Sequence, residues 1–295
     1  MDAPALRVYA AARAWLPVCR QLSARVRFTI ALATVQAANH KALQVVRSIC
    51  CKRCWLLIAK HIFMTPEIDY KKQAAVQALE LVRSGMVLGL GSGSTIAHFI
   101  DELGARLRSG QLQRVCGVPT SLETAQRATA AGIALTTLAA HAQLELAVDG
   151  ADEIDAQCNL IKGLGRSMLR EKVVVQHALQ FVVVADDSKR VGRLGTRGPL
   201  PVEILPFEAG AHVRWLGTLG CRAELWLAAD GTPLVTDNGN QLAKCWFTDG
   251  IGDPWALALQ LQARAGIVEH GLFLGMATQV ITAGAGGVRS QRCTL

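Results

Sequence analysis

An apolar strand that runs directly into an acidic turn, at residues 144–155, constrains this chain more than any other feature. Residues 146–148 are typical of the end of a buried strand, and Asp149-Gly150 is a strong turn signal. Four carboxylates then fall within the seven residues 149–155. Carboxylates just past the carboxyl end of a strand lie where open α/β sheets bind their ligands. A solvated loop before a charged helix would show the same pattern, so both interpretations stay open.

Strand-like and helix-like stretches alternate up to residue 198, which predicts a doubly wound, mostly parallel, Rossmann-like α/β sheet. The loops after its strands are then expected to share one edge. Thr65 is the expected N-cap of the first helix, with Pro66 at the first helical position. The expected strands are 86–90, 114–118, 134–138, 145–148 and 181–185, and the expected helices include 66–82, 96–100 and 122–131.

Beyond residue 198 the pattern changes to short strands around two helices, which indicates a small α+β domain. Its expected strands are 199–204, 223–227, 234–236 and 242–247, and its expected helices are 211–219 and 254–263. Residues 271–274 and 278–283 are expected to return to the main sheet. The predicted organisation is a catalytic α/β domain at 64–198, a smaller α+β domain at 199–276 inserted before the final strand, and a returning strand and C-terminal tail at 277–295.

The first 63 residues differ from the rest in charge. They hold 10 of the 31 Lys and Arg residues with Asp2 as their one acid, whereas the remaining basic and acidic residues nearly balance. The net charge of +8 therefore does not indicate a nucleic-acid partner. A non-functional upstream stretch, translated from too early a start codon, is the interpretation that Met64 favours. A transit-like presequence stays open, and so does a membrane-associated segment, although its apolar runs are too short to span a bilayer.

The nine cysteines have no regular spacing, which argues against a disulfide framework and for a reducing, cytoplasmic compartment. Cys51 and Cys54 have the spacing of half a zinc site, but no second pair of Cys or His complements them. We therefore expect neither a metal nor a cofactor, and no membrane partner.

A turn rich in Gly and Ser, Gly91 to Thr95, follows the expected strand 86–90 and precedes a helix. Glycines let the backbone approach a ligand, and the N–H groups at a helix start attract an anion. Ser94 occupies the third glycine position of a dinucleotide fingerprint, and the lysine of a nucleotide P-loop is missing. The turn therefore favours a small phosphorylated ligand, with a tight turn that binds nothing as the alternative.

Taken in order, the motifs of this chain resemble those of ribose-5-phosphate isomerases of the A type. The resemblance extends over essentially 64–289, and the segments that carry it are 89–95, 148–153, 162–172, 185–189, 199–203, 235–240 and 266–273. One departure is that Leu164 and Arg166 interrupt the glycine-rich run that follows the lysine in the family. A side chain at 164 would crowd the substrate or require a different local turn.

The resemblance implies an aldose–ketose isomerase of the non-oxidative pentose phosphate pathway that interconverts D-ribose 5-phosphate and D-ribulose 5-phosphate through an enediolate. Glu171 is the implied carbon base, because a carboxylate can take a proton and return it. Asp149 is expected to assist ring opening and hydroxyl proton transfer, Asp152 to hold sugar hydroxyls, and Lys162 to stabilise the enediolate. Asp155, Glu153 and Lys172 are interpreted as structural.

The family positions also imply a set of substrate-binding residues and a homodimer or a dimer of dimers. The substrate-binding residues are Ser92, Gly93, Ser94, Thr95, Asp149, Gly150, Ala151, Asp152, Lys162, Gly163, Leu164, Gly165, Lys189 and Lys71. The alternative function is a non-catalytic, sugar-phosphate-sensing domain of a transcription regulator. Against it, 1–63 shows no clear helix-turn-helix, and a sensor has no use for the Lys162 and Glu171 pair.

Overall fold

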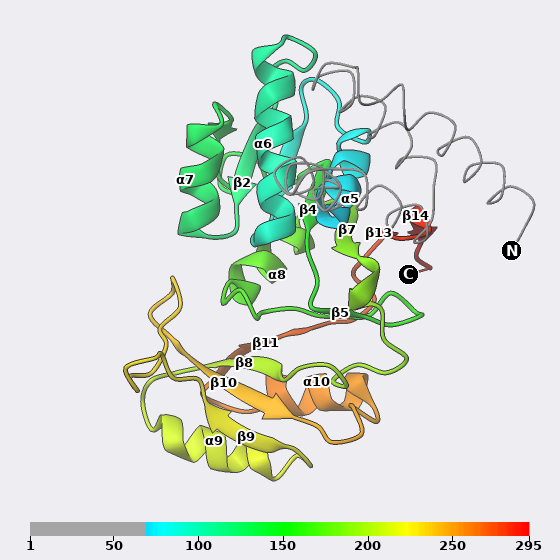
Figure 1. Cartoon of the computed structure of the whole chain (residues 1–295). Helices are drawn as coiled ribbons and strands as arrows, with labels where there is room; N and C mark the ends of the chain where they lie inside the picture. The colour runs from blue at the N-terminus through cyan, green and yellow to red at the C-terminus, as the bar shows by residue number, and fades with distance from the viewer. Residues whose placement is uncertain (1–68, 295) are drawn as a thin grey trace, which may run out of the picture. The chain divides into compact units, whose positions relative to one another are not determined.

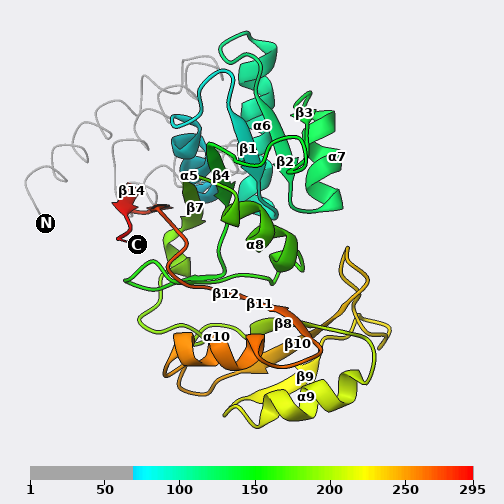
Figure 2. The ribbon, with the colours of Figure 1, turned by 180° about the vertical axis from the view of Figure 1, so that it is seen from behind.

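The computed structural model describes residues 69–294, which are built around a seven-stranded sheet (Figure 1). Its strand order is β14-β13-β7-β4-β1-β2-β3, and every neighbouring pair is parallel except β13 and β14. Figure 2 shows β3 at one edge and β14 at the other. The strands are β1 (Val87–Leu90), β2 (Cys116–Pro119), β3 (Ala134–Leu135), β4 (Leu146–Asp149), β7 (Phe181–Asp186), β13 (Gln279–Gly284) and β14 (Gly287–Arg292). The predicted α/β class with a mostly parallel sheet is confirmed.

Helices cover both faces of this sheet, because its central strands are apolar on both sides. Val148 and Val184 face a core shared with α5 and α6, whereas Ala147 and Val183 face the opposite core, which includes residues of α8. Gly89 of β1 lets α8 lie close to the sheet, since a Cβ there would lie 2.6 Å from Val174 Cγ1. The helices are α5 (Tyr70–Leu79), α6 (Ser94–Arg108), α7 (Leu122–Ala130) and α8 (Met168–Gln176).

The first described helix begins later than predicted. Its N-cap is Asp69, whose side chain accepts a hydrogen bond from the backbone N–H of Lys72. Asp69 has an extended backbone, so the predicted unbroken helix over 66–82 is wrong, and Thr65 and Pro66 themselves lie outside the described residues. Aspartate caps a helix as well as threonine does, so the sequence held two competing start signals.

A second, four-stranded sheet is antiparallel throughout and has the order β11-β8-β10-β9. Val202, Leu216 and Leu261 belong to the core that it shares with two helices. The strands are β8 (Leu200–Ile204), β9 (Arg222–Leu225), β10 (Gln241–Trp246) and β11 (Ile267–His270), and the helices are α9 (Ala209–Gly217) and α10 (Pro254–Gln262). Residues 69–295 form one compact unit, so the division into domains at 198 and 276 stays a prediction, and segment 1–63 lies outside the described residues.

Two predictions for this part of the chain are wrong. The strand expected at 234–236 is absent, and Val235 makes only an isolated bridge to Gln241. Instead, the side chains of Thr236, Asn238 and Asn240 all donate hydrogen bonds to the buried Glu203. These bonds hold residues 236–240 in a turn. Residues 272–273 do not return to the main sheet either. They form β12 (Leu272–Phe273) in a small three-stranded sheet with β5 (Glu153–Ile154) and β6 (Leu160–Ile161).

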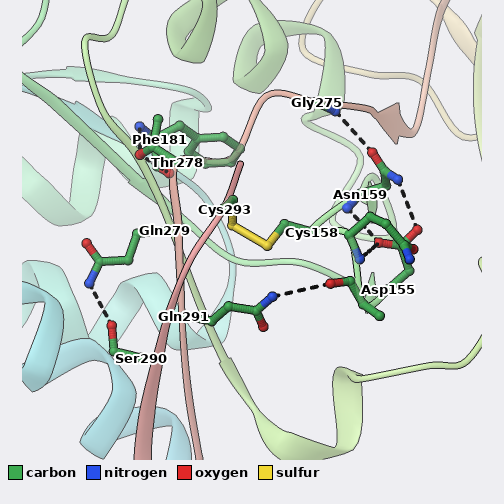
Figure 3. The surroundings of a disulfide bond; sticks show 12 residues. Asp155, Cys158, Asn159, Phe181, Gly275, Thr278, Gln279, Ser290, Gln291 and Cys293 are labelled. Atoms are coloured by element: carbon green, nitrogen blue, oxygen red, sulfur yellow. Dashed lines mark hydrogen bonds between the residues drawn. A yellow bond between two sulfur atoms is a disulfide. The ribbon is translucent and has the colours of Figure 1, made fainter. Parts of the chain in front are cut away.

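A disulfide bond joins Cys158 to Cys293 (Figure 3), with Cα atoms 6.0 Å apart across a sequence separation of 135 residues. It connects the turn between β5 and β6 to the residue that follows β14. In the same turn, Asn159 accepts a hydrogen bond from Gly275 N and donates one to Asp155. Irregular spacing predicted no disulfide framework, and for this pair that expectation is wrong, because the fold brings distant segments together. The free cysteines of the described part are Cys116, Cys221 and Cys245.

Within residues 69–294, none of the helices combines the length and apolar character needed to cross a membrane.

Candidate active site

The loops that follow β1, β2, β4 and β7 meet at the carboxyl edge of the sheet. Ser92 joins three of them, because its backbone N–H donates to Asp149 Oδ1 over 3.1 Å and its Oγ lies 2.8 Å from Thr120 Oγ1. Gly91 is required at this meeting point, since a Cβ there would lie 2.2 Å from Asp149 Cγ. The sheet thus places the Gly/Ser turn directly beside the first carboxylate of the acidic turn.

Lys162, Asp149 and Glu171 form a buried ionic cluster beside that meeting point. Lys162 Nζ lies 3.0 Å from Asp149 Oδ2 and 3.2 Å from Glu171 Oε2, and it donates to Gly150 O over 2.5 Å. All three charged residues are under 5 % exposed. They come from three different elements: Asp149 ends β4, Lys162 follows β6, and Glu171 lies in the first turn of α8, where a carboxylate is favoured.

Burial and mutual charge shift the pKa values of all three groups. Burial raises the pKa of the Asp149 carboxyl, although Lys162 opposes the rise. Burial, followed by the charge of Asp149, raises the pKa of Glu171 to about 8. Burial alone would lower the pKa of Lys162, but the two carboxylates outweigh it and raise that pKa. The cluster is therefore a lysine that stays charged beside two coupled carboxyls, one of which binds a proton near neutral pH.

One oxygen of each carboxylate in the cluster is poorly satisfied. Asp149 Oδ2 and Glu171 Oε2 are buried, and neither makes a hydrogen bond of good geometry to any residue in 69–294. Their partner is the charge of Lys162 alone. Buried carboxylate oxygens normally have hydrogen-bond donors, and exceptions are common where a group must exchange protons.

The Gly/Ser turn leads into α6 without a side-chain cap. Gly93 is the N-cap, with φ of 96°, and no side chain among residues 69–294 binds the first N–H groups of the helix. Gly93 and Ser94 are exposed and Thr95 is half-buried. Lys71 Nζ donates to Ser94 Oγ over 3.0 Å, which brings a positive charge to the same helix start. Backbone donors, hydroxyls and a cation together make a site suited to an anion.

Ser92, unlike its neighbours in that turn, uses its side chain for contacts inside the protein. Its Oγ also contacts Ser121 Oγ at 2.8 Å and Thr124 Oγ1 at 3.1 Å, so it joins the turn to the start of α7. Thr120, Ser121 and Thr124 were not among the site residues predicted from the sequence. Their signal was available, since they follow a predicted strand and therefore lie at the ligand-binding edge.

The interrupted glycine-rich segment requires no unusual backbone conformation at Leu164, and the expected crowding of the substrate stays a prediction. Leu164 is 39 % exposed and lies outside the left-handed region, and its N–H donates to Asp152 Oδ2 over 2.9 Å. Gly163 and Arg166 have φ of 113° and 67°, so the second interruption is the strained one. Gly165 is exposed beside them.

The remaining predicted residues lie around this centre. Gly150 N donates to Asp149 Oδ1 over 2.7 Å, and Ala151 is half-buried. Lys189 ends the short 3-10 helix η1 (Asp187–Lys189) after β7. Burial would raise the pKa of the Asp186 carboxyl, but hydrogen bonds from Ser188 and the charges of Lys189 and Lys71 lower it.

The three charged residues interpreted as structural make contacts suited to that role. Glu153 accepts backbone hydrogen bonds from 195, 197 and 198. Asp155 accepts two backbone hydrogen bonds from the turn before β6 and a third from Asn159 Nδ2. Lys172 Nζ binds Glu269 Oε1 over 2.6 Å and a backbone carbonyl. In the described part, no group of three or more His, Cys, Asp or Glu side chains is arranged to hold a metal ion.

A doubly wound sheet with buried acid–base groups beside an anion-binding helix start defines a class of enzymes that act on small phosphorylated molecules. The family model for ribose 5-phosphate isomerase A (phosphoriboisomerase A) matches residues 116–287. Ribose-5-phosphate isomerase A of Roseiflexus castenholzii is 51 % identical over 224 residues, which are 76 % of this chain and 95 % of that protein. The Arabidopsis thaliana protein named "Probable ribose-5-phosphate isomerase 3, chloroplastic" is 46 % identical over 75 % of this chain and 82 % of its own length.

Solved structures agree with these relatives. A D-ribose-5-phosphate isomerase in complex with phospho-erythronic acid superposes with a TM-score of 0.74 at 36 % identity, over 76 % of this chain and 98 % of that one. The chain belongs to the ribose 5-phosphate isomerase A family, and it is an isomerase. These relatives do not favour the alternative of a sensing domain.

Proposed function

We propose that the buried cluster of Asp149, Lys162 and Glu171 interconverts D-ribose 5-phosphate and D-ribulose 5-phosphate. The observation that carries this assignment is a charged lysine within 3.2 Å of two carboxylates with raised pKa values, next to an anion-binding turn. An aldose–ketose isomerisation needs this combination. One group must move a proton between adjacent carbons, and another must stabilise the negative oxygen that forms meanwhile.

Glu171 is the carbon base in this proposal. Its carboxylate removes the proton from C2 of the open-chain aldose, and the electron pair of the C–H bond forms the C1–C2 double bond of an enediolate. The same carboxyl then returns the proton to C1, which yields the ketose. A base that is half-protonated near pH 8 suits both halves of this transfer, because it gives up a proton as readily as it accepts one.

Lys162, Asp149 and Asp152 act on the oxygen atoms of the sugar. Lys162 keeps its charge between two carboxylates, so it stabilises the enediolate oxygen as negative charge develops there. Asp149 carries the hydroxyl proton between O1 and O2 and assists ring opening. Asp152 holds sugar hydroxyls at the mouth of the site, where its Oδ2 already accepts a hydrogen bond from the backbone of Leu164. None of these steps uses a metal or a cofactor.

The phosphate group binds at the start of α6 in this account. Residues 93–95 supply backbone N–H groups and the hydroxyls of Ser94 and Thr95, and Lys71 and Lys189 supply positive charge. Ser92 shapes the turn through its hydrogen bonds to Asp149 and Ser121. Gly150, Ala151, Gly163, Leu164 and Gly165 line the sugar between the phosphate turn and the cluster.

The wider setting of the enzyme is also a proposal. The phosphopentose substrates are those of the non-oxidative pentose phosphate pathway, and we further propose that the enzyme acts in the cytoplasm as a homodimer or a dimer of dimers. The Arabidopsis relative carries the word chloroplastic in its name, so fractionation of the source cells is the test of the compartment.

Ser94→Asp tests the phosphate assignment. It places a negative charge at an exposed helix start and should raise the KM for ribose 5-phosphate by at least about tenfold, because like charges repel there. Calorimetric binding of unphosphorylated ribose should hardly change. Ser109→Asp is the matched control, since it adds the same charge at the C-cap of the same helix. An equal loss of affinity for both sugars would show that this turn does not bind the phosphate.

A further inference from the structure

The turn at residues 236–240, which separates Val235 from β10, is fastened to the four-stranded sheet by one buried carboxylate. Glu203 of β8 is fully buried, and its Oε1 accepts hydrogen bonds from three side chains of the turn. These donors are Thr236 Oγ1 at 2.9 Å, Asn238 Nδ2 at 3.1 Å and Asn240 Nδ2 at 2.9 Å. Charge-assisted hydrogen bonds of this kind hold a turn in one conformation.

The outer side of the 236–240 turn contacts the helix that carries the proposed base. Arg170 Nε donates to Asn238 Oδ1 and Arg170 Nη2 donates to the Asp237 carbonyl, both over 2.7 Å. Arg170 Nη1 also lies 3.6 Å from Asp237 Oδ2. Arg170 immediately precedes Glu171 in α8, so this fork fixes the backbone turn from which the base projects.

The same turn contacts the helix that supports the phosphate turn. Asp237 Oδ2 accepts a hydrogen bond from the backbone N–H of Leu122, the first residue of α7, over 2.8 Å. The N-cap of that helix, Ser121, lies 2.8 Å from Ser92 Oγ. One carboxylate therefore links the start of α7 to Arg170, although 115 residues separate Asp237 from Leu122.

We propose that the 236–240 turn is a positioning clamp that sets the distance between the proton-transferring carboxyl and the phosphate turn. This inference rests on the proposed function of the site. Arg170, Asp237 and Asn238 are positioning residues, because their contacts run to α8 and α7 rather than to the reacting atoms. A substrate held by its phosphate at one end needs the base at a fixed separation, and misplacement by about 1 Å can cost about 100-fold in rate.

The two sides of the clamp predict different kinetic defects. Arg170→Ala and Asn238→Ala release α8 and should lower kcat at least about tenfold, with KM changed less than about threefold. Asp237→Ala also removes the acceptor for Leu122 N, so it should raise KM as well as lower kcat. Arg170→Ala already removes the contact with Asn238, so adding Asn238→Ala should lower kcat little further.

The experiment measures kcat, KM and thermal unfolding for the full chain and each variant. Arg127→Ala is the matched control, because Arg127 forms a comparable two-pronged contact with Asp101 away from the site. It should lower the unfolding temperature without changing kcat. Arg170→Lys retains the charge but not the fork, so it should recover kcat only in part.

The outcomes separate this inference from the proposed function. If the wild-type chain fails to turn over ribose 5-phosphate, the proposed function falls. If the wild type is active and Arg170→Ala keeps its kcat while melting lower, as Arg127→Ala does, the clamp is merely structural and the inference is overturned. If Arg170→Ala does not fold, Asn238→Ala and Arg170→Lys provide the same test. Wild-type kcat with a lower unfolding temperature in both variants would overturn the inference.

Discussion

The Gly/Ser turn and the ionic cluster are neighbours, but they are made of different groups. The turn at 92–95 is largely open to solvent and offers hydroxyls, backbone N–H groups and the side chain of Lys71. The cluster of Asp149, Lys162 and Glu171 is almost fully buried, and Lys162 Nζ lies within 3.2 Å of an oxygen of each carboxylate. Solvent screens charge in the first region and not in the second, and burial raises the pKa values of both carboxyls in the cluster.

This difference implies a division of labour. Exposed donors bind an anion about equally well in the ground state and in the transition state, so changes there should appear mainly in KM. Buried charges act on the charge that develops during reaction, so changes there should appear mainly in kcat. The following predictions test that division, in order of decreasing effect on turnover.

Of the three tests of this division, Lys162→Met should give the largest loss of turnover. The substitution removes the cation opposite the developing oxyanion and should lower kcat by about 10²–10³-fold. It also leaves Asp149 and Glu171 buried without a compensating charge, so both should retain protons to higher pH. Steady-state kinetics with ribose 5-phosphate measures the effect. A fall in kcat of less than about fivefold would contradict this division of labour, because the buried charge of Lys162 would then contribute little to the reaction.

The pH dependence should separate the two regions. Glu171 must be ionised in the free enzyme to remove a proton, and its pKa is raised to about 8. Accordingly kcat/KM should rise with pH, level off above about 8, and lie about tenfold below the plateau one unit under that pKa. The phosphate of the substrate titrates near pH 6, so binding changes should fall there instead. A profile flat between pH 6.5 and 9 would contradict the burial-driven shift.

Cys293→Ser should affect turnover least. The disulfide to Cys158 pins the turn between β5 and β6, yet the cluster is held by burial and by its own ion pairs. We expect a loss of about 2–5 kcal/mol in the free energy of unfolding, because the bond closes a long loop. The value of kcat for the folded variant should stay within about twofold of wild type. Denaturant titration under oxidising conditions measures the free energy of unfolding. Cys221→Ser is the matched control, because Cys221 is a free cysteine and its loss breaks no disulfide.

The central strands were predictable from the sequence because their signals are local. Apolar runs ending in turn residues marked β1, β4 and β7, and the Gly/Ser turn marked the start of α6. Asp149, Lys162 and Glu171 were named from a family resemblance, and the structure brings all three together. The prediction failed where two local signals competed, as with Asp69 and Thr65.

Other features could not be predicted because they depend on distant partners. Strand β14 is largely exposed and forms by pairing with β13, and β11 pairs with β8 across the chain. The partners of Cys158 and Arg170 lie 135 and 67 residues away. No periodicity encodes such pairings, since they arise only when the sheet and the helices have packed.

The central claim is that Glu171 transfers the carbon proton, and Glu171→Gln tests it most directly. The amide keeps the shape and the contacts of the side chain but cannot accept a proton. The Kd for ribose 5-phosphate, measured by calorimetry, should stay within about threefold of wild type. The value of kcat should fall by about 10²–10⁴-fold. Exchange of the C2 proton in deuterated water, followed by NMR, should fall with it. If the variant keeps more than about a tenth of the wild-type kcat, another group is the base and the account of this site is wrong.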